Sequence, residues 1–109
     1  MIILLLYTFI SMQSYTTTPC VATWYDMHGS RTASGIRMHR DSLTAAYNQV
    51  ALGTKLEIRN RITNASCIVT VTDRMGIKTA NRIDLSYAAF GCIANHSQGK
   101  VPVLVTKIN

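Results

Sequence analysis

Acidic residues are scarce in this sequence. Its 109 residues include 5 Asp and Glu against 11 Lys and Arg, which gives a formal net charge of +6 and a pI near 9.6. Such an excess favours anionic partners, namely nucleic acid, acidic lipid surfaces or anionic glycans, although a solvated surface with a mild positive bias would look the same. The basic residues stand singly and no nucleic-acid-binding motif occurs, so we predict no nucleic-acid partner.

Ligand patterns for metals are also missing. There is no Cys-x-x-Cys pair and no His/Cys spacing typical of zinc, so we expect neither a metal nor a cofactor. Surface positions are expected for the three histidines, His28, His39 and His96. The three cysteines allow three alternative single disulfides, between which the sequence does not choose: Cys20, Cys67 and Cys92.

No apolar run is long enough to span a bilayer, which takes about 20 residues. Residues 2–10 are continuously apolar and resemble the core of a secretory signal, but no basic segment precedes them and no small-x-small cleavage site follows. We predict a signal peptide or disordered leader over residues 1–19, followed by one exported, monomeric domain over residues 20–109. An uncleaved anchor or a buried N-terminal strand is the alternative.

The sequence also lacks any amphipathic helical pattern of 10–15 residues. Short runs with alternating or β-branched apolar residues predict an all-β domain of about six strands, including 20–25, 43–47, 55–59, 67–72 and 101–106. One short helix is expected over residues 84–91, capped by Ser86 and ended by Gly91. Residues 26–42 are predicted to be a long surface loop, a kind of segment that is often functional.

Two of the five carboxylates follow apolar runs that are typical of strands. They are Asp73, after the run Cys67–Thr72, and Asp84, after Arg82-Ile83. A carboxylic acid at a strand end can be held rigidly and partly shielded from water, which suits it for proton transfer. The alternative for Asp73 is that it pairs with Arg74 or Arg82, or caps a turn, and simply holds a loop. For Asp84 the alternative is a structural role just before the helix cap.

Several motifs in one order resemble the rare lipoprotein A family over residues 21 to about 106. They are Ala22-Thr23-Trp24-Tyr25, Thr32-Ala33-Ser34-Gly35, Leu43-Thr44-Ala45-Ala46, Leu52-Gly53-Thr54, Val71-Thr72-Asp73-Arg74 and Arg82-Ile83-Asp84-Leu85-Ser86. The resemblance implies a six-stranded double-psi β-barrel with one short helix, the fold of expansins. It also implies endolytic cleavage of peptidoglycan glycan strands, with a preference for glycan stripped of stem peptides.

The resemblance assigns roles to particular residues. The family's acid falls on Asp73, and an Asp that is essential in expansins falls on Asp84. Two positions depart from the family, because Ile36 stands where a Glu is usual and Tyr47 where a His is usual.

The implied reaction is that of a lytic transglycosylase. One carboxylic acid protonates the glycosidic oxygen, and its conjugate base then takes the proton of the muramic acid C6 hydroxyl, which closes on C1 to give a 1,6-anhydro end. No second catalytic carboxylate is required, in contrast to glycoside hydrolases. We expect Asp73 to be the acid/base, with support from Asp84.

Three further residues are expected to bind substrate: Tyr25, Tyr47 and Arg74. Trp24 and Tyr25 alternate along a strand, so only one can face a groove, and the hydroxyl of Tyr25 tolerates water.

A non-catalytic, expansin-like glycan-binding or wall-loosening module is the alternative function, which Ile36 and Tyr47 favour. A barwin-like module has less support because the cysteines are too few. Whether the protein is a transglycosylase or a glycan-binding module, we expect it in the periplasm, the cell envelope or the medium.

Overall fold

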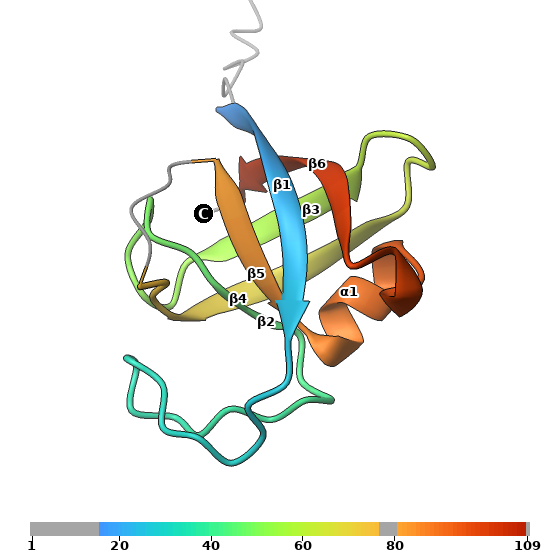
Figure 1. Cartoon of the computed structure of the whole chain (residues 1–109). Helices are drawn as coiled ribbons and strands as arrows, with labels where there is room; N and C mark the ends of the chain where they lie inside the picture. The colour runs from blue at the N-terminus through green and yellow to red at the C-terminus, as the bar shows by residue number, and fades with distance from the viewer. Residues whose placement is uncertain (1–15, 77–80, 109) are drawn as a thin grey trace, which may run out of the picture.

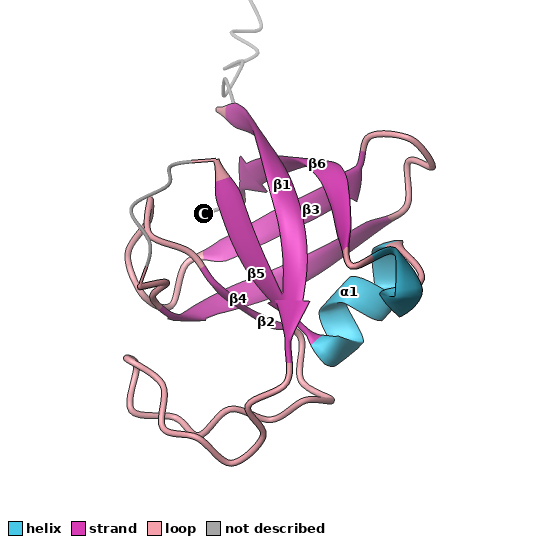
Figure 2. Ribbon diagram, viewed as in Figure 1, coloured by secondary structure: helices cyan, strands magenta, loops and turns pink. Residues whose placement is uncertain are grey.

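Six strands close into a barrel in the spatial order β1-β5-β2-β4-β3-β6 in the computed structural model, which describes residues 16–76 and 81–108 (Figures 1 and 2). Pairs β1/β5 and β2/β4 are parallel and the other four are antiparallel. The expected all-β, six-stranded barrel with one short helix is confirmed. The elements are β1 (Thr17–Tyr25), β2 (Thr44–Ala46), β3 (Lys55–Asn60), β4 (Ser66–Asp73), β5 (Arg82–Ser86), α1 (Tyr87–Ile93), a 3-10 turn (His96–Gln98) and β6 (Lys100–Lys107).

Alternate residues of the strands fill the barrel with apolar side chains. In β3, Leu56 and Ile58 are buried while Lys55 is exposed, as the period of two in a strand requires. Val69 and Val71 in β4 and Ile83 and Leu85 in β5 follow the same rule. The alternation leaves the odd residues of β1, and Arg82 and Asp84 of β5, on the outer surface, where they can meet a ligand.

The helix begins later than predicted. Asp84 lies in β5, and α1 starts at Tyr87 after the N-cap Ser86, whose Oγ accepts a hydrogen bond from Ala89 N. The predicted cap is confirmed, but the predicted start at Asp84 is wrong because residues 82–86 pair with β1 and β2.

The predicted helix end at Gly91 is also wrong. The buried side chains of Phe90 and Ile93 hold a further turn against the barrel, and the helix ends at Ala94 in extended backbone. Gly91 is needed for space, because a Cβ there would approach the His96 ring to 2.9 Å.

The barrel begins three residues before the expected domain start at Cys20. Thr17 pairs with Thr106 and Pro19 with Leu104, so residues 17–19 belong to β1. The rest of the predicted leader is Thr16, which precedes the strand, and residues 1–15, which lie outside the described residues. Within the described ranges, no helix is long and apolar enough to cross a membrane.

The three cysteines are free thiols. Cys20 Sγ lies 3.8 Å from the Tyr47 hydroxyl. Burial raises the pKa of the Cys67 thiol to about 12, and the neighbouring Cys92 thiol adds to this rise.

Among residues 16–76 and 81–108, no group of three or more His, Cys, Asp or Glu side chains could hold a metal ion.

One histidine departs from the predicted surface position. The His96 ring is half-buried, stacks on Tyr87 with ring centroids 3.8 Å apart, and meets the edge of Trp24.

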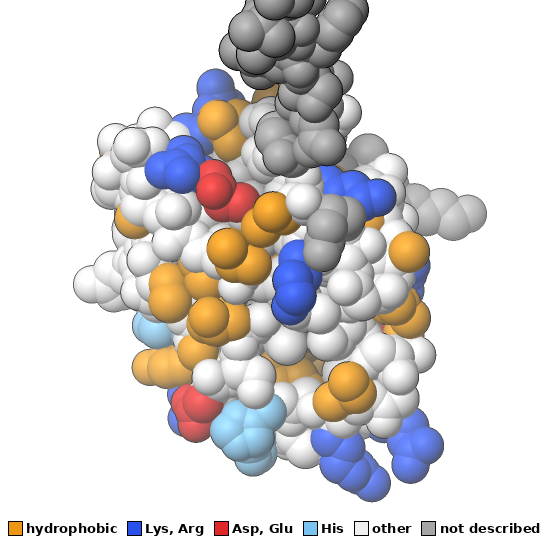
Figure 3. Space-filling view, turned by 180° about the vertical axis from the view of Figure 1, so that it is seen from behind, with side chains coloured by type: hydrophobic (Ala, Val, Ile, Leu, Met, Phe, Trp, Pro, Cys, Tyr) orange, Lys and Arg blue, Asp and Glu red, His pale blue; other side chains and the backbone are white. Residues whose placement is uncertain are grey.

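The basic side chains visible from behind the molecule are spread from its upper to its lower edge rather than gathered in one block (Figure 3).

Removal of the Phe90 ring should destabilise the fold strongly, because this side chain is fully buried between α1 and the barrel. We expect Phe90→Ala to lower the free energy of unfolding by about 3–5 kcal/mol, measured by urea denaturation. Ile62→Ala is the control: its side chain is 75% exposed, so the expected change is within about 0.5 kcal/mol. Similar losses for the two variants would contradict this packing.

Candidate functional site

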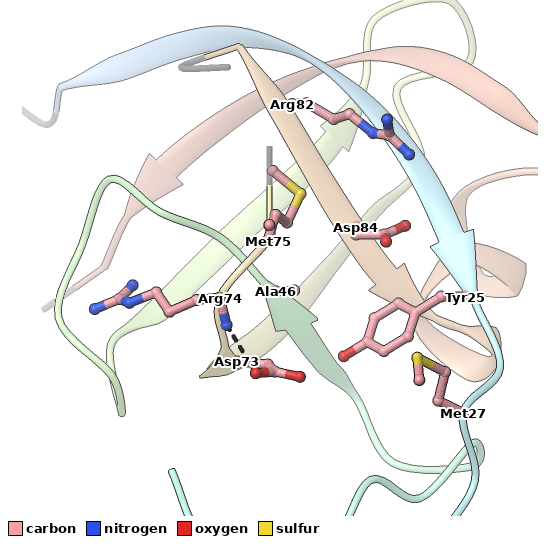
Figure 4. A pocket seen from close by; sticks show the side chains of 9 residues that line it. Tyr25, Met27, Ala46, Asp73, Arg74, Met75, Arg82 and Asp84 are labelled. Carbon is pink, nitrogen blue, oxygen red and sulfur yellow. Dashed lines mark hydrogen bonds between the residues drawn. The ribbon is translucent and has the colours of Figure 1, made fainter. Parts of the chain in front are cut away.

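A cavity of about 330 Å³ opens on the outer surface of the barrel, where β1, β5, β2 and β4 lie side by side (Figure 4). Ala46 in β2 pairs with Asp84 in β5 on one side and with Asp73 in β4 on the other. Since neighbouring strands lie about 4.8 Å apart, the backbones of the two aspartates are about 10 Å apart across β2. The cavity is lined by Tyr25, Met27, Ala46, Asp73, Arg74, Met75, Gly76, Arg82 and Asp84.

Backbone amides hold the Asp73 carboxylate. Its Oδ1 accepts hydrogen bonds from Ala33 N at 3.0 Å and from Arg74 N at 2.9 Å. Ala33 belongs to the predicted long loop, which is also tied to the end of β4 by Ser34 N donating to Thr72 O. The loop therefore has a structural part in the site, because it fixes one oxygen of the half-buried Asp73 side chain.

No guanidinium pairs with Asp73 in the described part of the chain. The two ion pairs found there join Arg40 to Asp26 and Arg59 to Glu57. The alternative that Asp73 is neutralised by Arg74 or Arg82 therefore finds no support in the structure. Asp73 is left as a half-buried carboxylate facing an open cavity.

Asp84 is oriented by a hydroxyl. Its Oδ1 accepts a hydrogen bond from Thr23 Oγ1 at 2.7 Å, and Thr23 Oγ1 in turn accepts from Arg82 Nε at 3.2 Å. Thr23 and Asp84 are direct partners in the β1/β5 register, which explains why the bond forms. The chain Arg82–Thr23–Asp84 fixes the second carboxylate in the cavity wall.

The Tyr25 hydroxyl points toward the side of the cavity where Asp73 lies (Figure 4). Its oxygen is buried and has no hydrogen-bond partner among the described residues, a condition that costs about 1–3 kcal/mol unless a ligand or water supplies the bond. Burial, followed by the charges of Asp73 and Asp84, raises the pKa of the Tyr25 phenol to about 12. Tyr25 is thus a neutral hydrogen-bonding group available to a ligand.

Trp24 faces the other way. Its ring meets Tyr87 edge-on with centroids 5.5 Å apart, and its Nε1–H donates to His96 O at 3.1 Å. Of the two neighbouring aromatic residues, Tyr25 therefore lies at the cavity and Trp24 packs beside α1.

Two predicted substrate-binding side chains are not directed into this cavity. The Tyr47 ring is buried in the core beside Cys20, where burial raises the pKa of its phenol. Arg74 lines the cavity, but its Nη1 donates to Tyr47 O and Val50 O, both at 2.6 Å. In Figure 4 its guanidinium points away from Asp73. Arg74 is used to hold the segment after β2.

The prediction of the site missed some residues. Met27 and Met75 flank the cavity as apolar walls, and Arg82 was considered only as a partner of Asp73. The alternation of side chains could have placed Arg82, because residues 82 and 84 of one strand share a face. No comparable signal marks Met27 or Met75, which come from loops.

Comparison with protein families yields one matching family model. It is described as lytic transglycolase and matches residues 17–105.

Curated relatives agree with this match. A probable endolytic peptidoglycan transglycosylase RlpA of Synechocystis is 37% identical over 81 residues, which is 72% of this chain and 25% of that protein. The endolytic peptidoglycan transglycosylase RlpA of Rickettsia felis is 35% identical over 100 residues, 87% of this chain and 43% of that protein. An uncharacterised Synechocystis protein, ssl3177, is 38% identical over 80% of this chain and 94% of its own length. The chain therefore spans less than half the length of these two RlpA relatives.

Solved structures share the fold. An expansin mutant of Clavibacter michiganensis in complex with cellohexaose superimposes with a TM-score of 0.75 at 19% identity, over 86% of this chain and 51% of that one. The Streptomyces papain inhibitor gives a TM-score of 0.74 at 20% identity, over 86% and 96% of the two chains.

The ionisation of Tyr25 tests the geometry of the cavity without any substrate. We expect the phenolate absorbance that is lost in Tyr25→Phe to appear with a midpoint near pH 12, against about 10 for an ordinary tyrosine. Asp73→Asn and Asp84→Asn should each lower the midpoint, because each removes a negative charge that opposes the phenolate. Stability that depends on the neutral phenol is then fully present below about pH 10 and is lost as the pH rises through 12.

Asp41→Asn is the matched control for this titration. It removes one carboxylate from an exposed position outside the cavity, so the midpoint should not move. A midpoint near 10 in protein shown to be folded by circular dichroism would contradict the arrangement of the three side chains.

Proposed function

This chain belongs to the lytic transglycolase family of double-psi β-barrel proteins, and we propose that it cleaves the glycan strands of peptidoglycan without hydrolysis. The observation that carries the proposal is the Asp73 carboxylate, half-buried, held by two backbone amides and unpaired with any described guanidinium, at the wall of an open cavity. We further propose that the protein acts as a monomer in the cell envelope or periplasm or after secretion, where its substrate is found, and that the segment before β1 serves its export.

Asp73 is the acid/base of the proposed reaction. Its protonated carboxyl gives a proton to the bridging oxygen as the bond between that oxygen and C1 of muramic acid breaks. The resulting carboxylate takes the proton of the C6 hydroxyl while the C6 oxygen forms a new bond to C1. The products are a free hydroxyl on one strand and a 1,6-anhydro end on the other, and no water is consumed.

Asp84 and Tyr25 support this step. The cleavage develops positive charge at C1, which a carboxylate fixed in the cavity wall stabilises. Asp84 is fixed in this way by Thr23. The Tyr25 hydroxyl, buried and without a described partner, supplies a hydrogen bond to a sugar hydroxyl beside the scissile bond. Met27 and Met75 offer apolar contact to the sugar rings.

A binding-only function is the second candidate, and two positions favour it. Ile36 stands where the family usually has a Glu, and its side chain is 65% exposed. Tyr47 stands where a His is usual, and its side chain is buried away from the cavity. A cavity without these two polar groups could bind glycan strands and leave them intact.

Incubation of the protein with sacculi stripped of stem peptides separates the two functions. We expect 1,6-anhydromuramyl products, detected by mass spectrometry, and a rate that falls by about 10²–10⁴-fold in Asp73→Asn because the general acid is lost. Asp41→Asn, which removes an exposed carboxylate outside the cavity, should cleave like the parent chain. Sedimentation with sacculi but no anhydro products from the parent chain would support the binding-only function and reject the catalytic one.

A further inference from the structure

Charges of both signs line the cavity, with one acid and one arginine on each side of β2. Asp73 and Asp84 contribute carboxylates, while Arg74 and Arg82 are its cationic lining residues. The Arg74 guanidinium is engaged with the carbonyl groups of Tyr47 and Val50. Arg82 is therefore the cation in the described lining whose guanidinium does not bind backbone carbonyl groups, although its Nε donates to Thr23 Oγ1, which in turn donates to Asp84.

Arg82 is anchored at one atom only. Its Nε donates to Thr23 Oγ1 at 3.2 Å, and its two Nη atoms have no hydrogen-bond partner among the described residues. Neither ion pair of the described chain includes Arg82, and residues 77–81, which precede it, contain no acid. A half-buried guanidinium that is held through Nε and presents its Nη donors beside a cavity matches the two oxygens of a carboxylate.

The spacing of Arg82 and Asp84 along β5 determines where an anionic group of a ligand would lie. Arg82 and Asp84 share the outer face of the strand and lie two residues apart, about 7 Å between Cα atoms. An anionic group of a bound ligand would be attracted to Arg82 and repelled by Asp84 and Asp73. The charges therefore favour one placement of such a ligand and oppose the reversed one.

Peptidoglycan strands carry a group of this kind. Each muramic acid has a lactyl ether that ends in a carboxylate, which is free only where the stem peptide has been removed, since an attached peptide converts it to an uncharged amide. Neutral glycans, such as the cellohexaose bound by the expansin, have no such group.

We propose that Arg82 is a specificity-determining residue that binds the free lactyl carboxylate of muramic acid. It thereby selects stripped peptidoglycan strands over neutral glycans and over strands that still carry stem peptides. The inference rests on the proposed glycan substrate, but not on cleavage of that substrate.

Binding to two matched glycans tests the proposal. Soluble stripped strands are compared with the same strands after conversion of their lactyl carboxylates to methyl amides, by calorimetric titration of the Asp73→Asn variant, which prevents cleavage. We expect the acid form to bind about tenfold more tightly, which corresponds to about 1.4 kcal/mol. Adding Arg82→Gln should abolish this difference, so that the acid form binds no more tightly than the amide form. Arg82→Lys should retain part of it, because the charge remains without the planar fork.

Arg61→Gln is the matched control. It removes the same charge from the turn between β3 and β4, away from the cavity, and should leave the preference for the acid form intact.

Three outcomes would overturn the inference. They are equal affinity for the two glycans in the presence of Arg82, an equal loss for both glycans in Arg82→Gln, and no binding of either glycan. The second would mean that Arg82 acts only by positioning Thr23 and Asp84. If the parent chain yields no anhydro products while the acid form is still preferred through Arg82, the proposed cleavage fails and the carboxylate site stands.

Discussion

The site depends on the pairing of one three-residue strand. β2 lies between β4 and β5, and its last residue, Ala46, is the partner of both Asp73 and Asp84. The register shifts between Ala45 and Ala46, and Tyr47 N then donates to Asp73 O, so the end of β4 is held against the end of β2. Because Ala46 has only a methyl group, the space above it stays open between the carboxylates. A larger side chain there would fill the floor of the cavity.

The polar groups around this floor are held by neutral donors rather than by counter-charges. Backbone amides hold Asp73, and a hydroxyl holds Asp84. The nearest arginine in sequence, Arg74, instead binds carbonyl oxygens of the segment after β2. This arrangement keeps both carboxylates in place without an ion pair in the described part of the chain. Because Arg82 also forms no ion pair among the described residues, its Nη donors are available to a ligand.

Local pattern predicted the strands better than the helix and the aromatic residues. The alternation in β3 and the β-branched run in β4 are properties of a few neighbouring residues, and both strands were placed to within a residue or two. The start of α1 was placed too early because Asp84 pairs with strands distant in sequence, and its end was placed too early because Gly91 is required by the His96 ring rather than by a turn. The burial of Tyr47 likewise depends on Cys20 and the barrel interior, which no local pattern reveals.

The sequence by itself determined the class of fold, the family resemblance and the two acids worth examining, since alternation, motif order and the scarcity of carboxylates can all be read along the chain. Only the tertiary structure decided which side chains share the cavity. Tyr25, Asp73, Arg82 and Asp84 come from three strands that meet through β2 and the β1/β5 register. Their approach, and the exclusion of Tyr47, follow from barrel closure, because long-range backbone pairing sets the face that each side chain occupies.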